Sequence, residues 1–538
     1  MRSTFIAALI IMTGVSACKK SDADVDPENP DTEDPASSER ADLTKDSIFY
    51  YAEAVYLWNK DLPSYKDFNP RSFIAGTDLL SYESELFKIT RYGINPETNQ
   101  PFEYNRSSPS YPKYSYISDL DDQNPVAMIA PKSAVNTDGV GYDLGIYSFS
   151  AFGTDNNYRL YIKAVYPGSP AAEKGLTRGA EITTIDGKRI GSSFQTEKDL
   201  INDLLDNTLT SAKLKGVKVD GTPFEVTLER ASYNSSPVYK SKVFESNGKK
   251  VGYIHLGRFS RMTSPEGNNP SDANLDPAIA EFAKEGLTDL IVDLRYNGGG
   301  YVSTAEHLIN LIAPSSASGV MYKEVYNETM QKRDKKAEIL KKQPLTDANG
   351  NIRYDANGNM LTYFNVDYSV AGNTATFKKT GALTGVKNIV FIVTGNTASA
   401  SELMINALKP YVNVKLVGQT TYGKPVGFFP VTIENRYDVY FSMFETRNSK
   451  DEGGYYAGMK PDVVDNTDDA KRDFEDANEN YIARALDILA PGPATNARAS
   501  MSVKGKNGVT LNLSPAMNER IKKTNEFVGM IETRHKIK

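Results

Sequence analysis

Hydrophobic and polar positions divide the chain into regions with three different patterns. Residues 45–132 are rich in aromatic side chains and repeat them at helical spacing, which predicts an N-terminal helical region. Residues 133–231 alternate short strands with glycine turns and predict a small β domain. Within residues 235–490, near-continuous apolar strands lead into small-residue loops and then helices, as at residues 388–408. Such units build parallel or mixed sheets covered by helices, so the pattern predicts a multidomain α/β protein.

The two ends of the chain do not fit any of these patterns. Residues 1–17 combine Arg2, a short apolar stretch and small residues, as a secretory signal peptide does. Residues 18–44 are rich in Asp, Glu, Pro and Ser and predict a flexible stalk. Residues 491–538 are polar with a basic end, and no role is predicted for this C-terminal extension.

The single cysteine, Cys18, directly follows the signal segment. Together with the preceding Val-Ser-Ala it resembles a bacterial lipobox, which would make Cys18 the lipidated first residue of the mature chain. The alternative is an ordinary signal cleaved after Ala17, which would leave a free thiol. We expect a lipid-anchored protein of the cell envelope, periplasmic or on the cell surface, that contacts the membrane through this anchor.

Composition limits the classes of partner. The 538 residues, 40% of them hydrophobic, are too many for one core and predict about two to four domains. Lys and Arg number 62 against 68 Asp and Glu, a net charge of −6, so there is no electrostatic case for a nucleic-acid partner. After the signal segment, no run approaches the roughly 20 apolar residues of a membrane span.

Two glycine-containing motifs resemble known ligand-binding loops. The glycines at residues 298–300 follow a strand, but neither a Walker lysine nor a full GxGxxG pattern accompanies them, so a phosphate site is not favoured. The sequence DANGN, which begins at Asp347 and again at Asp355, lacks the distal glutamate of an EF-hand, and its Asn-Gly steps favour β-hairpin turns over a calcium site. We expect neither a metal nor a cofactor.

The strongest chemical signal is a serine at a strand-to-helix junction. Ser399 follows the apolar strand at residues 388–393, and Lys424 lies in a loop next to Gly423. Only three histidines occur in the chain, and we interpret His255, which lies on a strand, as a half-buried structural side chain rather than a base. A Ser/Lys hydrolase is therefore the favoured chemistry. The alternative makes the serine a helix cap and the lysine a surface turn residue.

A lysine can act as this base only if its pKa is lowered. The free side chain, with a pKa near 10.4, is almost fully protonated at neutral pH. Lowering the pKa to roughly 7–8 requires destabilising the ammonium by about 3–5 kcal/mol, which desolvation can supply. Apolar neighbours such as Tyr422, Phe428 and Phe429 favour this around Lys424.

The β domain at residues 133–231 resembles a PDZ domain, and GSPAAEKGLTRGAEITTIDG at residues 168–187 is the most specific part of the match. GVGYDLGI begins where that family has its carboxylate-binding loop. The resemblance implies that polypeptide C-termini bind there, with the strand edge beside the loop pairing with the peptide. The residues expected to bind peptide are Gly139, Val140, Gly141 and Tyr142.

Three motifs follow in order: DLRYNGGG at residues 293–300, SASE at residues 399–402, and Gly-Lys at residues 423–424. They resemble the motifs of C-terminal processing, or tail-specific, serine peptidases, and the order of a PDZ-like domain before the catalytic domain agrees. The resemblance implies a mixed α/β catalytic domain of the ClpP/crotonase type at residues 235–490. The charged segment at residues 313–385 is then an insertion, expected to contain a helix near its start.

The same resemblance assigns roles to single residues. Ser399 is the expected nucleophile and Lys424 its general base, while backbone N–H groups of Ala400 and of Gly299 or Gly300 are expected to form the oxyanion hole.

Two positions depart from the family pattern. Many members carry a glutamine four residues after the lysine or an aspartate eleven residues after the serine, where this chain has Phe428 and Pro410. The residue that orients the lysine is therefore not identified from the sequence.

These features together predict a serine endopeptidase that cleaves unfolded or tail-exposed polypeptides through an acyl-enzyme. The alternative from another class is a catalytically inactive PDZ lipoprotein that binds peptide tails. An esterase with the same Ser/Lys pair is a third reading.

Overall fold

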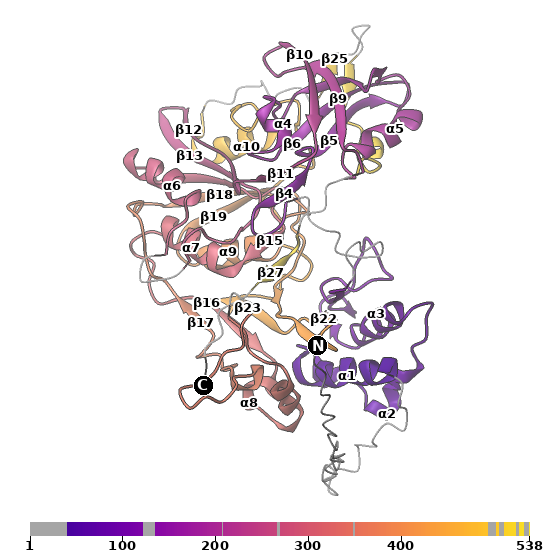
Figure 1. Ribbon diagram of the computed structural model, residues 1–538. Helices are drawn as coiled ribbons and strands as arrows, with labels where there is room; N and C mark the ends of the chain where they lie inside the picture. Colours follow the sequence, from indigo (N-terminus) through magenta and orange to yellow (C-terminus); the bar gives the residue numbers. More distant parts are fainter. Residues whose placement is uncertain are drawn as a thin grey trace, which may run out of the picture.

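A computed structural model describes most of the chain. The described residues are 40–121, 135–206, 208–265, 270–347, 350–492, 502–504, 510–522, 527–531 and 537. The predicted signal peptide, Cys18 and most of the predicted stalk lie outside them, as does the predicted boundary between the helical region and the PDZ-like domain. Figure 1 shows the PDZ-like domain at the top, the catalytic domain in the middle and the N-terminal helices at the lower right.

A six-stranded sheet forms the centre of the catalytic domain, in the order β12-β13-β14-β18-β19-β24. The β12–β13 pair is antiparallel and the remaining pairs are parallel. The strands are β12 Val238–Ser246, β13 Lys249–Leu256, β14 Asp289–Asp293, β18 Asn388–Val393, β19 Asn413–Gly418 and β24 Val463–Val464. The strands β14 and β18 are parallel neighbours, so the loops after them lie at the same edge of the sheet.

Helices cover both faces of this sheet. On one face, Leu290 and Val292 of β14 pack in a single cluster with α6 (Leu275–Lys284), α7 (Val302–Ile312) and α9 (Ala400–Leu408). On the other face, Ile291 of β14 and Val390 of β18 pack with α10 (Asn480–Leu489). Strands buried on both faces must be apolar at nearly every position, which is the pattern that predicted them. The α/β class predicted from the sequence is confirmed.

Two smaller sheets extend the catalytic domain toward the N-terminal region. The first has the order β17-β16-β23-β20, and the second has the order β21-β22-β3, in which β3 comes from the N-terminal region. Their strands are β17 Thr374–Thr376, β16 Val320–Tyr326, β23 Phe444–Asn448, β20 Val426–Gly427, β21 Val431–Ile433, β22 Tyr437–Tyr440 and β3 Tyr116–Asp119. A chain segment from outside the catalytic domain therefore completes a sheet next to the loop that carries Lys424.

The insertion differs from the expected charged helix. Its first part is strand β16, followed by the short helices α8 (Glu328–Lys332) and η3 (Lys335–Lys342), and later by η4 (Tyr363–Asn365). Alternate residues of β16 are buried against β23, so pairing within the sheet overrides the helical propensity of this charged sequence. The DANGN segments form tight turns, because Gly350 donates to the Asp347 carbonyl and Gly358 to the Asp355 carbonyl. The hairpin interpretation of both repeats is confirmed.

The N-terminal region is helical as predicted, with a different start. Its elements are α1 Arg40–Val55, η1 Asn59–Asp61, α2 Tyr65–Phe68, η2 Pro70–Ser72, α3 Asp78–Ile89, β1 Ile94–Asn95 and β2 Gln100–Pro101. The chain is already helical at Arg40, within the predicted stalk. Asp46 lies inside this helix and forms an ion pair with the partly exposed Arg71 at 2.6 Å.

The PDZ-like domain is built on a sheet in the order β10-β9-β7-β6-β5, with β8 paired to β7. Its elements are β4 Val140–Asp143, β5 Ile146–Thr154, β6 Asn157–Val165, α4 Pro170–Glu173, β7 Glu181–Ile185, β8 Lys188–Arg189, α5 Phe194–Asp203, β9 Ser211–Val217, β10 Pro223–Glu229 and β11 Ala231–Asn234. Strand β5 lies at the edge of this sheet, and β4 pairs separately with β11.

A buried group of charges joins this domain to the catalytic domain. Arg178 of the PDZ-like domain, its side chain fully buried, pairs with Asp468 at 2.5 Å and donates to Tyr296 at 2.8 Å. Arg295 of the catalytic domain pairs with the same Asp468 at 3.0 Å and with Glu479 at 2.7 Å. Because two arginines share these carboxylates, the orientation of the two domains is fixed at this point.

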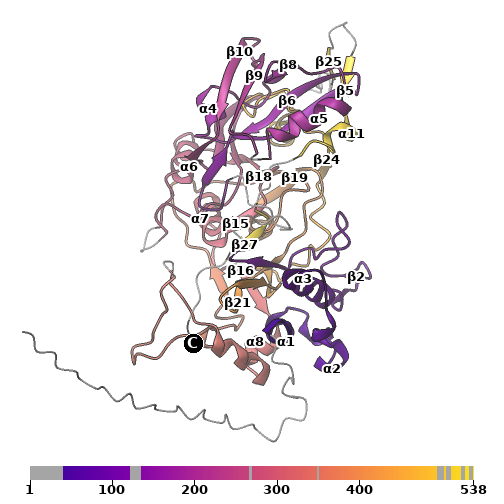
Figure 2. The ribbon, with the colours of Figure 1, turned by 45° about the vertical axis from the view of Figure 1, so that its right-hand side comes forward.

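The C-terminal extension runs back across both domains. It contains β25 Ser502–Lys504, β26 Thr510–Asn512, α11 Pro515–Asn518 and β27 Gly529–Ile531. Figure 2 shows α11 beside the PDZ-like domain and β27 beside β15 (Gly299–Tyr301) of the catalytic domain. In the part of the chain that the structure describes, no helix has the length and apolar character needed to cross a bilayer.

We expect Arg178→Ala to lower the free energy of unfolding by about 3–5 kcal/mol, because it breaks a buried ion pair and leaves Arg295 as the remaining arginine partner of Asp468 and Glu479. The matched control is Arg261→Ala, which removes an ion pair of exposed side chains with Asp138 and should cost about 0–1 kcal/mol. Urea unfolding followed by intrinsic fluorescence measures both. Equal midpoints for the two variants would contradict the role given to Arg178.

Candidate active site

Ser399 lies at the turn between β18 and α9. Its backbone has φ +60° and ψ −112°, a conformation that is strained for a residue with a side chain and that persists only where its surroundings enforce it. The turn is held by Ala398, which donates to the Asn297 carbonyl at 3.1 Å, and by Leu403, which donates to the Ser399 carbonyl at 2.8 Å. The Ser399 side chain is fully buried, and its hydroxyl has no hydrogen-bond partner among the described residues.

Lys424 lies in the loop between β19 and β20 and is 2% exposed. Burial lowers the pKa of its amine from 10.5 to about 7, although Glu103 and Glu402 act in the opposite direction. Its Nζ atom lies 4.4 Å from the centre of the Phe428 ring and donates a hydrogen bond to the Val528 carbonyl at 3.0 Å. The apolar surroundings predicted from the sequence therefore include Phe428. This residue stands four positions after the lysine, where the chain departs from the family pattern.

The Glu402 carboxylate joins the serine turn to the lysine loop. It accepts backbone N–H groups from Ser399 at 2.9 Å, Gly423 at 2.7 Å and Lys424 at 2.8 Å, and it also accepts the Thr421 hydroxyl. Burial raises the pKa of this carboxyl, and the four donors act against that shift. Glu402 belongs to the SASE motif, and no role was predicted for it. Its position three residues after Ser399 is nevertheless that of a capping-box partner.

The N-terminal region contributes to the site, although the sequence predicted no chemical role for that region. The Tyr114 hydroxyl donates to the Gly423 carbonyl, and Tyr422 donates to the Lys113 carbonyl at 2.9 Å. The nearby Glu103 carboxylate is fully buried and accepts from the backbone of Tyr114 at 3.1 Å. These contacts cover the lysine loop and exclude water from it.

The glycine loop after β14 requires glycine at two positions. Gly299 and Gly300 have φ values of +113° and +134°, and a Cβ atom on Gly300 would collide with the Phe259 carbonyl. The Gly299 N–H donates to the Asn297 side chain at 2.9 Å, so this group is already used. A Cβ on Gly299 would lie 3.0 Å from the Ser399 Cβ and would collide with the Gly529 carbonyl oxygen. The glycine loop, the serine and the C-terminal extension therefore meet at one place.

The two histidines that the structure describes, His255 and His307, take no part in this arrangement. His255 is fully buried on β13, and desolvation lowers its pKa to about 4. Its ring packs on Phe474, with the ring centres 4.1 Å apart. His307 contacts Asp276 at 2.5 Å. His255 was expected to be half buried; it is completely buried, and a structural role fits it.

The residues predicted to bind peptide in the PDZ-like domain lie in a strand ladder. Val140, Gly141 and Tyr142 pair with β11, and Gly139 donates to the Asn136 carbonyl at 2.9 Å. Their role as a carboxylate loop stays a prediction. The edge strand β5 follows this loop and contacts the C-terminal extension through the bridge between Phe152 and Leu513.

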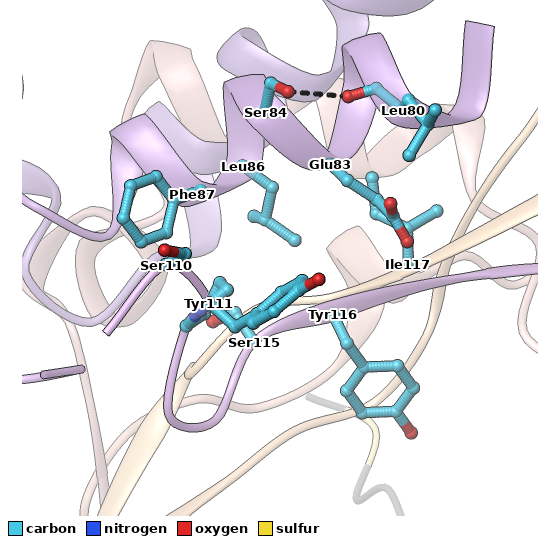
Figure 3. A pocket seen from close by; sticks show the side chains of 11 residues that line it. Leu80, Glu83, Ser84, Leu86, Phe87, Ser110, Tyr111, Ser115, Tyr116 and Ile117 are labelled. Carbon is cyan, nitrogen blue, oxygen red and sulfur yellow. Dashed lines mark hydrogen bonds between the residues drawn. The ribbon is translucent and has the colours of Figure 1, made fainter. Parts of the chain in front are cut away.

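A separate pocket of about 190 Å³ lies in the N-terminal region, between α3 and the segment that leads into β3. Its lining includes Leu86, Phe87 and Ile117, and Figure 3 shows them around one cavity, with the Ser84 hydroxyl bonded to the Leu80 carbonyl. None of the lining residues belongs to the Ser399 site. Among the described residues, no group of three or more His, Cys, Asp or Glu side chains is placed to hold a metal ion.

Comparison with known proteins agrees with this geometry. The model of peptidase family S41 matches residues 250–465, and a PDZ domain model matches residues 161–205. Residues 250–465 of the chain are therefore similar to peptidase family S41. This matched region contains both Ser399 and Lys424.

Two curated relatives and one solved structure are similar to this chain. It is 25% identical over 345 residues to a carboxyl-terminal-processing protease of Synechocystis sp., a match that covers 64% of this chain and 67% of the relative. It is 24% identical over 341 residues to the carboxy-terminal processing protease CtpA of Bacillus subtilis, with 62% and 60% covered. The crystal structure of a putative S41 protease from Bacteroides fragilis superposes with a TM-score of 0.51 at 22% identity and covers 82% of this chain and 97% of that one.

These matches span about half to two thirds of the length of the curated relatives. The predicted organisation, with N-terminal helices, a PDZ domain and a catalytic domain of the ClpP/crotonase type, is confirmed.

We expect Glu402→Gln to lower both the free energy of unfolding, by about 1–3 kcal/mol, and the rate of peptide hydrolysis. The amide replaces an acceptor by a donor, so at least one buried N–H loses its partner. The matched control is Glu281→Gln, the same change at an exposed glutamate that pairs with Lys284. Urea unfolding and a hydrolysis assay measure the two effects. A Glu402 variant that is indistinguishable from the control in both assays would contradict the role of this carboxylate.

Proposed function

We propose that the protein is a serine endopeptidase that cleaves unfolded or tail-exposed polypeptides, with Ser399 as nucleophile and Lys424 as general base. The observation that carries the proposal is a lysine buried next to the serine turn with its pKa lowered to about 7. The similarity of residues 250–465 to peptidase family S41 and the likeness to carboxyl-terminal-processing proteases support the reaction class.

The proposed reaction uses the two side chains as nucleophile and base. The neutral amine of Lys424 takes the proton from Ser399 as the hydroxyl oxygen attacks the carbonyl carbon of the scissile bond. The ammonium then gives that proton to the leaving amine, and the peptide bond breaks to leave an acyl-enzyme. Water, deprotonated by the same amine, hydrolyses the ester and releases a carboxylic acid.

Stabilisation of the oxyanion is assigned to backbone groups at the same corner. Ala400 is the first residue of α9, where the positive end of the helix dipole favours a negative oxygen. Gly300 is the second candidate: the N–H of Gly299 is bound to Asn297, whereas the N–H of Gly300 faces the Gly529 carbonyl of β27, which must leave first. The Asn297 side chain thereby fixes the glycine loop beside the serine.

Substrate delivery and location complete the proposal. The PDZ domain is proposed to bind C-terminal segments of polypeptides along the edge of β5 by strand addition. Lipidation of Cys18 is proposed to hold the enzyme in the cell envelope, facing the periplasm or the cell surface. The sequence pattern of the signal segment and the polar stalk supports this location.

Replacing either reacting side chain should abolish hydrolysis. We expect Ser399→Ala and Lys424→Met each to reduce the cleavage of casein by at least about a thousandfold. The matched control is Lys379→Met, because burial also lowers the pKa of that lysine, to about 8, while its amine binds the carbonyls of Asn310 and Leu311. The control should stay within about twofold of the native rate. If all four folded proteins are equally inactive, the catalytically inactive PDZ lipoprotein becomes the better account.

The pH dependence of hydrolysis should report the lysine. Because only the neutral amine accepts the serine proton, kcat/KM should rise about tenfold per pH unit below pH 7 and level off above it. A short fluorogenic peptide assayed between about pH 5 and 9 gives the profile. A half-maximal rate above about pH 9 would show a lysine that titrates at its ordinary pKa and would contradict the desolvation argument.

A further inference from the structure

The edge of the PDZ domain is already paired with a peptide segment, and that segment belongs to this chain. Leu513 forms an antiparallel bridge with Phe152 of β5. Next to it, Ser514 donates its N–H to the Ala151 carbonyl at 3.1 Å. The side-chain amide of Asn518 both accepts from Ala151 N–H at 3.1 Å and donates to its carbonyl at 2.9 Å. The C-terminal extension therefore uses the backbone groups of the strand that a bound peptide would use.

Two apolar side chains of the same segment enter the core of the PDZ domain. Met517 and Ile521, each 4% exposed, pack in one cluster with Phe194 and Ile201 of α5. Asn202 of α5 donates to the Arg520 carbonyl at 3.2 Å and accepts the Lys522 N–H at 2.8 Å. The extension thus lies across β5 and α5 with both its backbone and its apolar side chains engaged.

Farther along, the same extension reaches the Ser399 site. Strand β27 pairs in parallel with β15, in a register that aligns Gly529 with Gly299, and Gly529 donates to the Gly298 carbonyl at 3.1 Å. Met530 is fully buried within the core cluster of the catalytic domain. In Figure 2, β27 lies directly beside β15, far along the molecule from α11.

Neighbouring residues of this segment contact Lys424 and lie close to Ser399. The Val528 carbonyl accepts the hydrogen bond from Lys424 Nζ at 3.0 Å. The Gly529 carbonyl oxygen lies near Ser399, because a Cβ atom placed on Gly299 would meet both this oxygen and the Ser399 Cβ. The Ser399 hydroxyl has no hydrogen-bond partner among the described residues, so the Lys424 amine, which donates to the Val528 carbonyl, is not hydrogen-bonded to the serine. The segment holds the site in an unreactive arrangement.

We propose that residues 510–522 and 527–531 act as a tethered peptide ligand of this enzyme, which occupies the PDZ edge and the active site together and is displaced by a polypeptide that binds in the same way. The inference rests on the proposed function of the Ser399 site. A competing polypeptide must pair an extended stretch with β5, must present apolar side chains to α5, and must carry a small residue where Gly529 lies. A Cβ at Gly529 would lie 2.5 Å from the Phe527 ring and 3.1 Å from the Phe428 ring.

Tethering gives the segment an advantage over a free peptide of equal intrinsic affinity. A linked ligand acts at an effective concentration on the order of millimolar. Micromolar concentrations of substrate would therefore compete poorly until contacts at one of the two positions are weakened. The segment is bound at two positions, the PDZ edge and the Ser399 site. Release of the segment from either position is therefore sufficient to increase the exposure of the Ser399 site.

Full-length variants test this proposal through two readouts. Met517→Asp with Ile521→Asp places charges in the apolar contact with α5, and Met530→Asp does so beside the active site. The matched control is Ala516→Asp, which introduces the same charge at an exposed position next to Met517. The first readout is binding of a labelled synthetic peptide of residues 510–531 to each variant in a Ser399→Ala background, and the second is casein hydrolysis with Ser399 intact.

Combining the three charged substitutions should tighten apparent peptide binding at least about tenfold over the Ala516→Asp control, and should raise casein hydrolysis by a similar factor. Unlabelled peptide added to the released variant should restore inhibition, which shows that the variant remains folded. Equal binding by all variants would overturn the proposal, whether or not they hydrolyse casein. Tighter binding without hydrolysis by any variant would support the tethered ligand and refute the proposed peptidase function.

Discussion

The site depends on one buried carboxylate that holds two loops together. Glu402 accepts three backbone N–H groups, one from the serine turn and two from the lysine loop, and a hydroxyl from the same loop. Without this acceptor, the donors would be buried and unpaired, although the backbone bond from the Tyr422 N–H to the Thr397 carbonyl would still join the two loops. The carboxylate also opposes the lowering of the lysine pKa, so desolvation by the surrounding aromatic side chains must outweigh it.

That desolvation comes from parts of the chain that are distant in sequence. Tyr114, in the N-terminal region, bonds to Gly423 across 309 positions, and β3 adds a strand to the sheet beside the lysine loop. At the other side, Val528 of the C-terminal extension bonds to Lys424. The catalytic sheet supplies the serine turn and the glycine loop, while the two ends of the chain enclose the base.

Much of this arrangement is readable from the sequence, for identifiable reasons. Strand β18 is a doubly buried apolar run and was predicted with its observed bounds, and the small residues after it marked the turn at Ser399. The glycine motif located the loop beside that turn because only glycine tolerates its backbone conformation.

The role of Glu402 was missed, although its position in the first turn of α9 was a usable local signal. The contributions of Glu103 and Tyr114 were missed because no local pattern records a contact between segments this far apart. The segment from 510 to 531 was likewise unreadable, since its short strands are defined by the edges with which they pair.

Covalent trapping of the serine tests the central claim most directly, namely that the buried amine of Lys424 activates the hydroxyl of Ser399. A serine-directed phosphonate reagent, which bonds to an oxygen that gives up its proton, is applied to the full-length chain carrying Met530→Asp and to the same chain with Lys424→Met added. Mass spectrometry of the digested protein then locates the adduct. The account predicts rapid modification at Ser399 that is lost when Lys424 is replaced. Modification of Ser399 at the same rate in both proteins would contradict it.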